Sequence, residues 1–141
     1  IVDYLQLIAG MGEESRRLQI SAISKGLKNI AQNLNIAVIA ISQLSRPERG
    51  QESRRPVLFA LKECGDLEND ADIVLFIHEP TEKEKDTFIE TLKYKASNQE
   101  KKKLRELLVA KNRQGAKTIV HLVWRADVFR FEEISIIDES Q

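Results

Sequence analysis

Two short, uninterrupted apolar runs constrain the fold of this chain more than any other feature. Residues 36–41 and residues 73–77 contain only aliphatic or aromatic side chains, and each run is bounded by polar residues. Runs of this length without polar alternation are typical of strands buried on both faces, as in a parallel sheet covered by helices. We therefore predict an α/β fold with a mostly parallel sheet and flanking helices.

The segments around these runs fit the same fold class. Apolar residues recur every three to five positions over residues 14–33, which predicts an amphipathic helix. Near the C-terminus, three segments have the composition of strands, at residues 104–110, 118–124 and 128–134. A turn at residues 112–115 joins the first two. We expect these strands to extend the sheet in antiparallel fashion.

Composition limits the class of protein. The 141 residues suffice for one domain, and 42% hydrophobic with 31% charged residues is a globular balance. Charged residues dominate positions 79–103, which we interpret as a solvated, partly helical insertion. Cys64 is the single cysteine, so an internal disulfide is excluded, and the two histidines lack zinc-ligand spacing. Neither a membrane span nor a signal peptide is apparent, so a cytoplasmic location is expected.

Polar residues directly follow two of the predicted strands. Ile1 and Val2 lead into Asp3, so the chain is expected to begin inside a strand, and residues 36–41 lead into Ser42 and Gln43. Parallel strands deliver such groups to one edge of a sheet, where ligands bind. An aspartate there can hold the water shell of Mg²⁺ beside nucleotide phosphates, and an amide can sense a phosphate. Each residue alone is also compatible with a solvated turn.

Two basic segments are candidates for phosphate contacts. Residues 45–56 contain two prolines and a glycine, which predicts an exposed loop, and four arginines, Arg46, Arg49, Arg54 and Arg55. The net charge of the whole chain is zero, so any nucleic-acid site must be a local patch of this kind. Lys111 and Arg113 lie at the predicted turn, from which an arginine can reach a phosphate in a neighbouring subunit. An exposed loop and an ordinary hairpin without function are the alternatives.

Five segments, taken in order, resemble the motor domain of DnaB-type replicative DNA helicases: IVDYLQLI, SRRLQISAISKGLKNIAQNLN, IAVIAISQLSR, RRPVLFALKECGDLENDADIVLFIH and VAKNRQG. The sequence of residues 79–103 differs from that of a typical family member. The resemblance implies one partial RecA-like domain over residues 1–141 that starts at the Walker B strand. The strand of the phosphate loop would lie between the strands ending at Ser42 and starting after Asp72, but no G-x-x-x-x-G-K-S/T motif occurs in this sequence.

The resemblance implies roles for the candidate residues. Asp3 corresponds to the Walker B aspartate, which holds Mg²⁺ through water beside ATP, and Gln43 to a glutamine that couples nucleotide state to the DNA loops. Arg113 falls on the arginine finger and Lys111 on its accompanying lysine, both acting on the adjacent subunit of a homohexamer. Residues 62–65 match an Arg-Glu-Ser-Gly motif that contacts single-stranded DNA through Lys62, Glu63 and Gly65. Lys62 and Cys64 depart from that motif, and lysine lacks the planar fork of arginine.

The function implied is that of an ATP-dependent hexameric helicase that translocates on single-stranded DNA and unwinds duplex at a bacterial or phage replication fork. A helicase loader and primase are further partners that the family implies. The chain alone is expected to be inactive because the phosphate loop and the family's catalytic glutamate are missing. Two alternatives stay open: a RecA-like recombinase or clock-type ATPase, and a non-catalytic module that keeps DNA-binding or subunit contacts.

Overall fold

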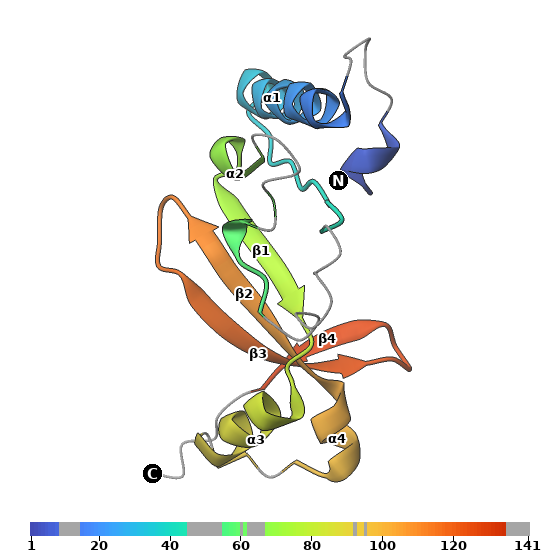
Figure 1. The fold of residues 1–141 in the computed structure, drawn as a ribbon, viewed down its shortest axis with the longest axis vertical. Coiled ribbons are helices and arrows are strands. Elements are labelled where there is room, and N and C mark those ends of the chain that lie inside the picture. Colours follow the sequence, from blue (N-terminus) through green and yellow to red (C-terminus); the bar gives the residue numbers. More distant parts are fainter. Residues whose placement is uncertain are drawn as a thin grey trace.

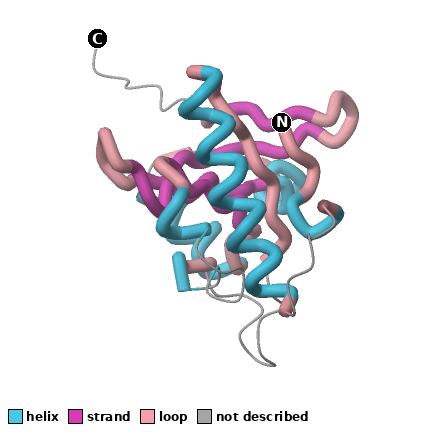
Figure 2. The backbone as a smooth tube through the Cα atoms, turned by 90° about the horizontal axis from the view of Figure 1, so that it is seen from above, coloured by secondary structure: helices cyan, strands magenta, loops and turns pink. Residues whose placement is uncertain are grey.

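The computed structural model of the chain describes residues 1–8, 15–44, 55–59, 61, 67–91, 93–94 and 96–134. The elements are, in order, η1 (Leu5–Leu7), α1 (Arg16–Leu34), α2 (Leu67–Asp70), β1 (Ile73–His78), α3 (Glu82–Thr91), α4 (Asn98–Lys103), β2 (Leu104–Asn112), β3 (Thr118–Arg125) and β4 (Arg130–Glu133). Helices α1 and α2 lie near one end of the sheet, and α3 and α4 near the other (Figure 1). Seen from the α1 end, α1 lies in front of the strands (Figure 2).

Helix α1 confirms the amphipathic helix predicted for residues 14–33. Ser15 caps its N-terminus by accepting a hydrogen bond from the backbone N–H of Leu18 at 3.3 Å. Asn35 ends the helix in the left-handed conformation, with φ of 51°, which asparagine tolerates better than most residues. The apolar face is covered in part: α1 contacts η1 and α2, and Ile20 is buried, whereas Leu18 is exposed.

The named strands form one antiparallel sheet in the order β1-β2-β3-β4, so the prediction of a mostly parallel sheet is wrong for them. Strand β1 pairs with β2 from Ile73 opposite Asn112 to His78 opposite Glu106. The predicted C-terminal extension is confirmed, since β2, β3 and β4 pair as successive antiparallel neighbours. Because β2 also pairs directly with β1, the antiparallel part includes the second apolar run.

Burial along β1 alternates, which corrects the expectation of a strand buried on both faces. Val74, Phe76 and His78 are buried, whereas Ile73, Leu75 and Ile77 are more than half exposed. The buried face packs against Leu61, Leu44 and Leu58, whereas the side chains on the opposite face stay exposed among the described residues. A continuous apolar run therefore did not by itself reveal which faces are packed.

Parallel pairing of the described residues occurs at one place, between the start of the chain and residues 36–41. Val2 and Ala40 form an isolated parallel bridge. The N–H of Val2 donates to the carbonyl of Ile39 at 2.8 Å, and the N–H of Ile41 donates to the carbonyl of Val2 at 2.9 Å. Ile39 and Ile41 remain exposed, so residues 36–41 are not buried on both faces as predicted. Side chains of an extended segment project from its two faces, and the described residues do not cover both of these faces.

The core lies on one face of β1 and β2. Its buried members are Leu61, Val74, Phe76 and Leu108, and partly buried residues packed against them are Leu44, Leu58, Ala71 and Ala110. Leu44 and Leu58 flank residues 45–54, which lie outside the described residues. Burial of apolar surface therefore holds Leu44 and Leu58 against the same sheet.

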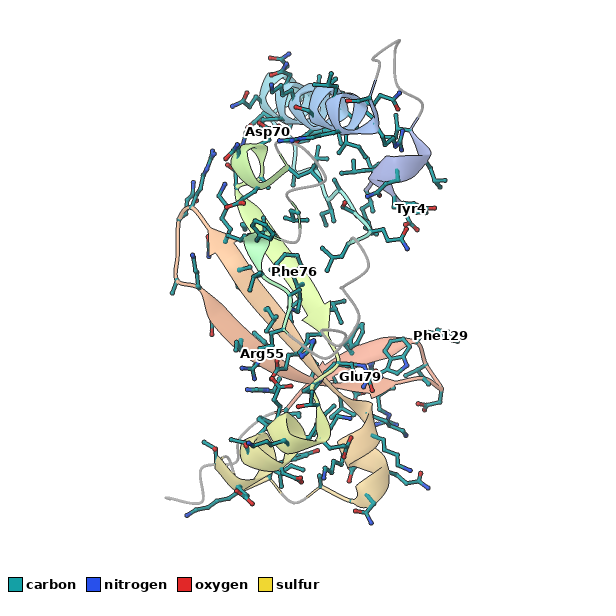
Figure 3. The ribbon with its side chains drawn as sticks, viewed as in Figure 1. Tyr4, Arg55, Asp70, Phe76, Glu79 and Phe129 are labelled. Atoms are coloured by element: carbon teal, nitrogen blue, oxygen red, sulfur yellow. The ribbon has the colours of Figure 1, made fainter. Side chains whose placement is uncertain are left out.

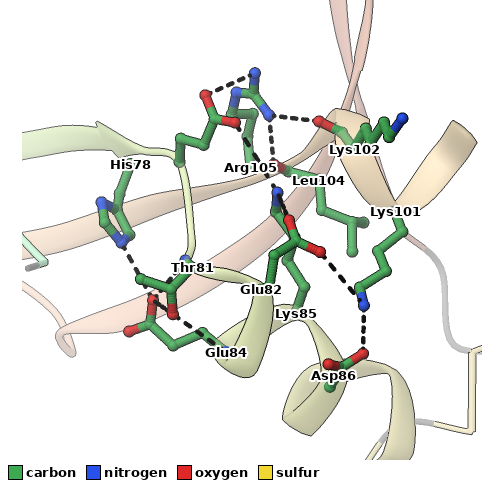
Figure 4. A network of polar contacts seen from close by, with 11 residues as sticks. His78, Thr81, Glu82, Glu84, Lys85, Asp86, Lys101, Lys102, Leu104 and Arg105 are labelled. Carbon is green, nitrogen blue, oxygen red and sulfur yellow. Dashed lines mark hydrogen bonds and ion pairs between the residues drawn. The ribbon is translucent and has the colours of Figure 1, made fainter. Parts of the chain in front are cut away.

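The charged segment at residues 79–103 contains α3 and α4, so the prediction that it is partly helical is confirmed. The segment also packs against the sheet. Phe88 of α3 is buried, and its ring centroid lies 4.0 Å from that of His121 on β3. Lys101 of α4 pairs with Glu82 at 3.4 Å and with Asp86 at 2.5 Å, so it ties the two helices together (Figure 4). The insertion is therefore packed at its base and charged on its outer face.

Candidate functional site

Asp3 and Gln43 leave the paired segments at the same edge, as predicted. Asp3 follows Val2 directly, Gln43 follows Ala40 by three positions, and the Val2–Ala40 bridge is parallel. Both segments of the chain therefore leave the bridge in the same direction. Asp3 and Gln43 are both exposed, so a carboxylate and an amide can reach a ligand from solvent at this edge.

Gln6 links these two segments by hydrogen bonds, a role that was not predicted from the sequence. Its Nε2 donates to the hydroxyl of Ser42 at 3.0 Å and to the carbonyl of Gln43 at 3.2 Å, and its Oε1 accepts from the N–H of Gln43 at 3.3 Å. Arg16, at the start of α1, donates to the carbonyl oxygen of Gln6. A glutamine between two leucines resembles a solvated turn residue, and no local pattern indicates a partner so distant in sequence. Gln6 therefore sets the position of Gln43 relative to Asp3.

The predicted turn after β2 is present, and its geometry depends on Asn112 and Gly115. The side-chain oxygen of Asn112 accepts a hydrogen bond from the N–H of Gln114 at 3.2 Å, which forms a local turn of the backbone. A Cβ added to Gly115 would lie 2.7 Å from Nδ2 of Asn112, so a larger residue there would require the Asn112 side chain to move. Arg113 is consequently held on a compact turn instead of a long loop.

Lys111 and Arg113 both point to the carboxyl end of α2. Lys111 Nζ donates to the carbonyl oxygens of Glu68 and Asn69. Arg113 Nη2 donates to the carbonyl of Asn69 at 2.7 Å, and Nη1 donates to Oδ1 of Asp72 at 3.1 Å. Unsatisfied carbonyls at the end of a helix are suited to such donors. The two basic side chains are therefore brought together by one short helix.

Helix α2 is in turn tied to α1. The Ser24 hydroxyl donates to Oδ2 of Asp70 at 2.6 Å, and Asp70 lies on the side of α2 that faces α1 (Figure 3). Lys28 of α1 lies 2.5 Å from Oδ2 of Asp72. This hydrogen bond, with the nearby charges of Arg113 and Lys111, lowers the pKa of the Asp72 carboxyl. Asp72 is thus ionised at neutral pH and shared by two elements.

The two pairs of candidate residues, Asp3 with Gln43 and Lys111 with Arg113, lie apart in space. Asp3 leads into η1, whereas the turn that carries Arg113 lies on the other side of α2 (Figure 1). The structure therefore places Asp3 and Gln43 after the same parallel bridge, and brings Lys111 and Arg113 together at α2.

Arg55, the loop arginine within the described residues, forms an ion pair with a buried carboxylate. Its Nε and Nη2 donate to the two carboxylate oxygens of Glu106, both at 2.8 Å, and Glu106 is only 2% exposed. The hydrogen bond to Glu106 raises the pKa of the Arg55 guanidinium. Figure 3 shows Arg55 beside the sheet. Glu106 shares the inward phase of β2 with Leu104 and Leu108, and a charged residue at that phase is the sequence signal that was missed.

Other charged groups surround this ion pair. Glu84 of α3 lies 3.6 Å from Arg55 Nε and 3.7 Å from His78 Nε2. Burial favours a raised pKa for Glu84, but hydrogen bonds from Thr81 and nearby positive charges lower it overall. Burial also lowers the pKa of His121, whose Nδ1 lies 4.0 Å from Glu106. Arg55 is therefore the cation that balances Glu106 at neutral pH.

The remaining predicted DNA-binding residues, Arg46, Arg49, Arg54, Lys62, Glu63 and Gly65, lie outside the described residues, as does Cys64. Among the described residues, no group of three or more His, Cys, Asp or Glu side chains is arranged to hold a metal ion. Asp3 nevertheless fits Mg²⁺, because this ion keeps several waters and takes further ligands from substrate phosphates. No helix in the described part of the chain is long and apolar enough to cross a membrane.

Comparison with known proteins places these features in a family. Residues 1–133 match the DnaB-like helicase C terminal domain. The replicative DNA helicase DnaB of Geobacillus stearothermophilus is 35% identical over 144 residues, which cover 100% of this chain and 29% of that protein. A solved DnaB-like replicative helicase, described with its interactions with primase, gives a TM-score of 0.71 at 36% identity and 92% coverage of this chain. A solved ATPase domain gives a TM-score of 0.72 at 36% identity, covering 94% of this chain and 43% of that one.

The chain spans 29% of the length of the Geobacillus helicase and of the solved DnaB-like helicase. The match over residues 1–133 includes the Asp3 segment, the arginine-rich segment and the turn with Arg113. It favours the helicase family over the RecA-like recombinases and clock-type ATPases that share the sheet. This chain belongs to the family of the DnaB-like helicase C-terminal domain.

Proposed function

We propose that the chain is part of the motor domain of an ATP-dependent replicative DNA helicase that works as a homohexamer. The observation that carries the proposal is the separation of Asp3 and Gln43 from Lys111 and Arg113 within one subunit. In a ring with head-to-tail contacts, opposite sides of one subunit meet different neighbours. An acid–amide pair on one side and a basic pair on the other then complete one nucleotide site from two chains.

Each residue has a defined task in this proposal. Mg²⁺ neutralises charge on the β- and γ-phosphates when it is bound. Asp3 would hold its water shell, and Gln43, positioned by Gln6, would respond to the phosphate at the same edge. Arg113 would supply its planar guanidinium to the phosphates of the adjacent subunit, with Lys111 as a second positive charge.

The exposed apolar side chains support the presence of the phosphate-binding half in the whole protein. Ile39 and Ile41 on one segment and Leu75 and Ile77 on β1 are exposed among the described residues. Large exposed apolar patches are uncommon on proteins unless a partner covers them. We propose that the strand of the phosphate loop lies between these two segments in the full-length protein.

Single-stranded DNA is the proposed polymer on which the motor moves. Lys62, Glu63 and Gly65 lie in the sequence shortly before α2. Arg46, Arg49 and Arg54 belong to the stretch between Leu44 and Leu58, which pack against the sheet. Basic side chains on loops neutralise phosphates without reading bases. Arg55 is proposed to anchor this segment through Glu106 more than to contact DNA. A helicase loader and primase are proposed partners of the whole protein.

Salt dependence tests the DNA part of the proposal. Replacing Lys62, Arg46 or Arg49 with alanine in the full-length hexamer should weaken binding to unrelated oligonucleotides alike. Each lost phosphate contact should make the slope of log affinity against log salt shallower by about 0.7. The matched control is Lys102→Ala, because Lys102 is exposed on α4 at the opposite end of the sheet from α2 (Figure 1). A preference for one sequence, or an unchanged slope in all three variants, would place the DNA site elsewhere.

The isolated 141-residue chain should show no ATP hydrolysis above background, because its sequence contains no phosphate loop. The measurement is phosphate release from ATP by the purified chain, with the full-length protein as the positive control. Turnover by the isolated chain that disappears on Asp3→Ala would show that the site is complete without further residues.

A further inference from the structure

Asp72 accepts hydrogen bonds from both the backbone and the side chain of Arg113. Its backbone N–H donates to the carbonyl of Asp72 at 3.0 Å, and its Nη1 donates to Oδ1 of the same residue at 3.1 Å. Nη2 donates to the carbonyl of Asn69 at 2.7 Å. A guanidinium has five N–H groups, so within the described part of the chain three further N–H groups can be offered to an anion. The contacts define a plane for the guanidinium without using all its donors.

The Asp72 carboxylate is itself held in place. Its second oxygen, Oδ2, lies 2.5 Å from Lys28 Nζ, which projects from α1. Lys111, the partner of Arg113 at the turn, also lowers the pKa of Asp72 through its charge. The Asp72 carboxylate therefore lies near three positive charges, those of Lys28, Arg113 and Lys111. Asp72 is thus fixed from the α1 side while Arg113 keeps donors for a phosphate.

We infer that Asp72 is a positioning residue for Arg113, which orients the guanidinium toward the phosphates of the neighbouring subunit and fixes that orientation to helix α1 through Lys28. The inference rests on the proposed function, since it requires Arg113 to act on a nucleotide. It adds Asp72 and Lys28 to the residues that support the action of Lys111 and Arg113 on the adjacent subunit.

We expect these contacts to orient the Arg113 guanidinium, and not to withhold it from a phosphate. The side chains of Arg113 and Asp72 are 49% and 56% exposed. Ion pairs between side chains as exposed as these are weak, because solvent screens them. Such a pair cannot keep Arg113 away from a triphosphate with several negative charges. It can reduce the number of side-chain conformations that Arg113 samples before the phosphate arrives, which is how preorganisation assists catalysis.

The test compares variants of the full-length hexamer by steady-state ATP hydrolysis. Asp72→Ala should lower kcat by about 10-fold to 10²-fold, the scale for a misplaced group, while KM for ATP changes by less than about twofold. Asp72→Asn should lose less, because its amide oxygen still accepts from Arg113 Nη1. Lys28→Ala should give a smaller loss in the same direction. Asp127→Ala is the matched control, since Asp127 pairs with Arg125 at 3.5 Å on another exposed turn of the same sheet.

A double-mutant cycle separates positioning from a general structural role. If Asp72 acts through Arg113, adding Asp72→Ala to Arg113→Ala should lower kcat no further. An added loss in that background, or a kcat for Asp72→Ala that is unchanged or raised while Arg113→Ala is inactive, would overturn the inference and leave the proposed function standing. Near-normal hydrolysis by Arg113→Ala itself would instead overturn the proposed function. Should Asp72→Ala fail to assemble, the same cycle run with Asp72→Asn decides.

Discussion

Replacing Arg113 with alanine should lower kcat for ATP hydrolysis by the full-length hexamer by about 10³-fold or more, as expected for an arginine that stabilises the transition state of phosphoryl transfer. Arg113 lies on a compact turn, is half exposed and has its guanidinium oriented by Asp72 and Asn69. Its charge contributes chiefly when negative charge develops on the phosphates. Nucleotide affinity and hexamer formation should therefore be largely retained.

The control for this prediction is Arg130→Ala. Arg130 is an exposed arginine on β4 of the same sheet, and it pairs with Glu132. Its replacement should leave kcat within about twofold of the unmodified protein, as for surface changes remote from the site. Hydrolysis, nucleotide binding and size-exclusion profiles are measured for both variants. Near-normal turnover by the Arg113 variant would remove this residue from the nucleotide site.

Arg55→Ala should destabilise the domain by about 3 kcal/mol, because it leaves the carboxylate of Glu106 buried without its partner. Glu106 has a side chain only 3% exposed, whereas that of Arg55 is 44% exposed. Water can enter where the guanidinium was, so the loss is expected near the lower limit for breaking a buried pair. The midpoint of urea unfolding of the full-length protein, followed by circular dichroism, measures this change.

A second variant shows whether charge or packing causes the loss. Combining Arg55→Met with Glu106→Leu removes both charges and keeps apolar volume, so it should recover much of the lost free energy of unfolding. A double variant that is as unstable as Arg55→Ala would mean that the pair contributes through side-chain shape. Unchanged stability in Arg55→Ala would contradict the ion-pair account of Arg55.

Local patterns were sufficient for the elements that depend on local residues. Helix α1, its length and its position followed from the spacing of apolar residues, and the three C-terminal strands followed from their composition and turn residues. The parallel direction of the segments that lead to Asp3 and Gln43 also followed from the sequence pattern. These features rest on rules about neighbouring positions and chain direction.

Sheet pairing and long-range contacts did not follow from local patterns. The apolar run at residues 73–77 was compatible with either direction of pairing, and only its partner β2 makes it antiparallel. The contacts of Gln6, Asp72 and Glu106 were missed because their partners are distant in sequence. Of the three, Glu106 left a trace, as a charge at the inward phase of an apolar strand.

Mixed hexamers test most directly whether Arg113 completes the nucleotide site of a neighbouring subunit. Asp3→Ala and Arg113→Ala chains are each expected to form inactive homohexamers. When the two are unfolded, combined in equal amounts and refolded together, roughly a quarter of the interfaces should pair an intact Asp3 with an intact Arg113 in a head-to-tail ring. The account predicts that ATP hydrolysis by the mixture rises clearly above that of either parent. A mixture no more active than its parents would contradict it, because Asp3 and Arg113 would then have to act within one chain.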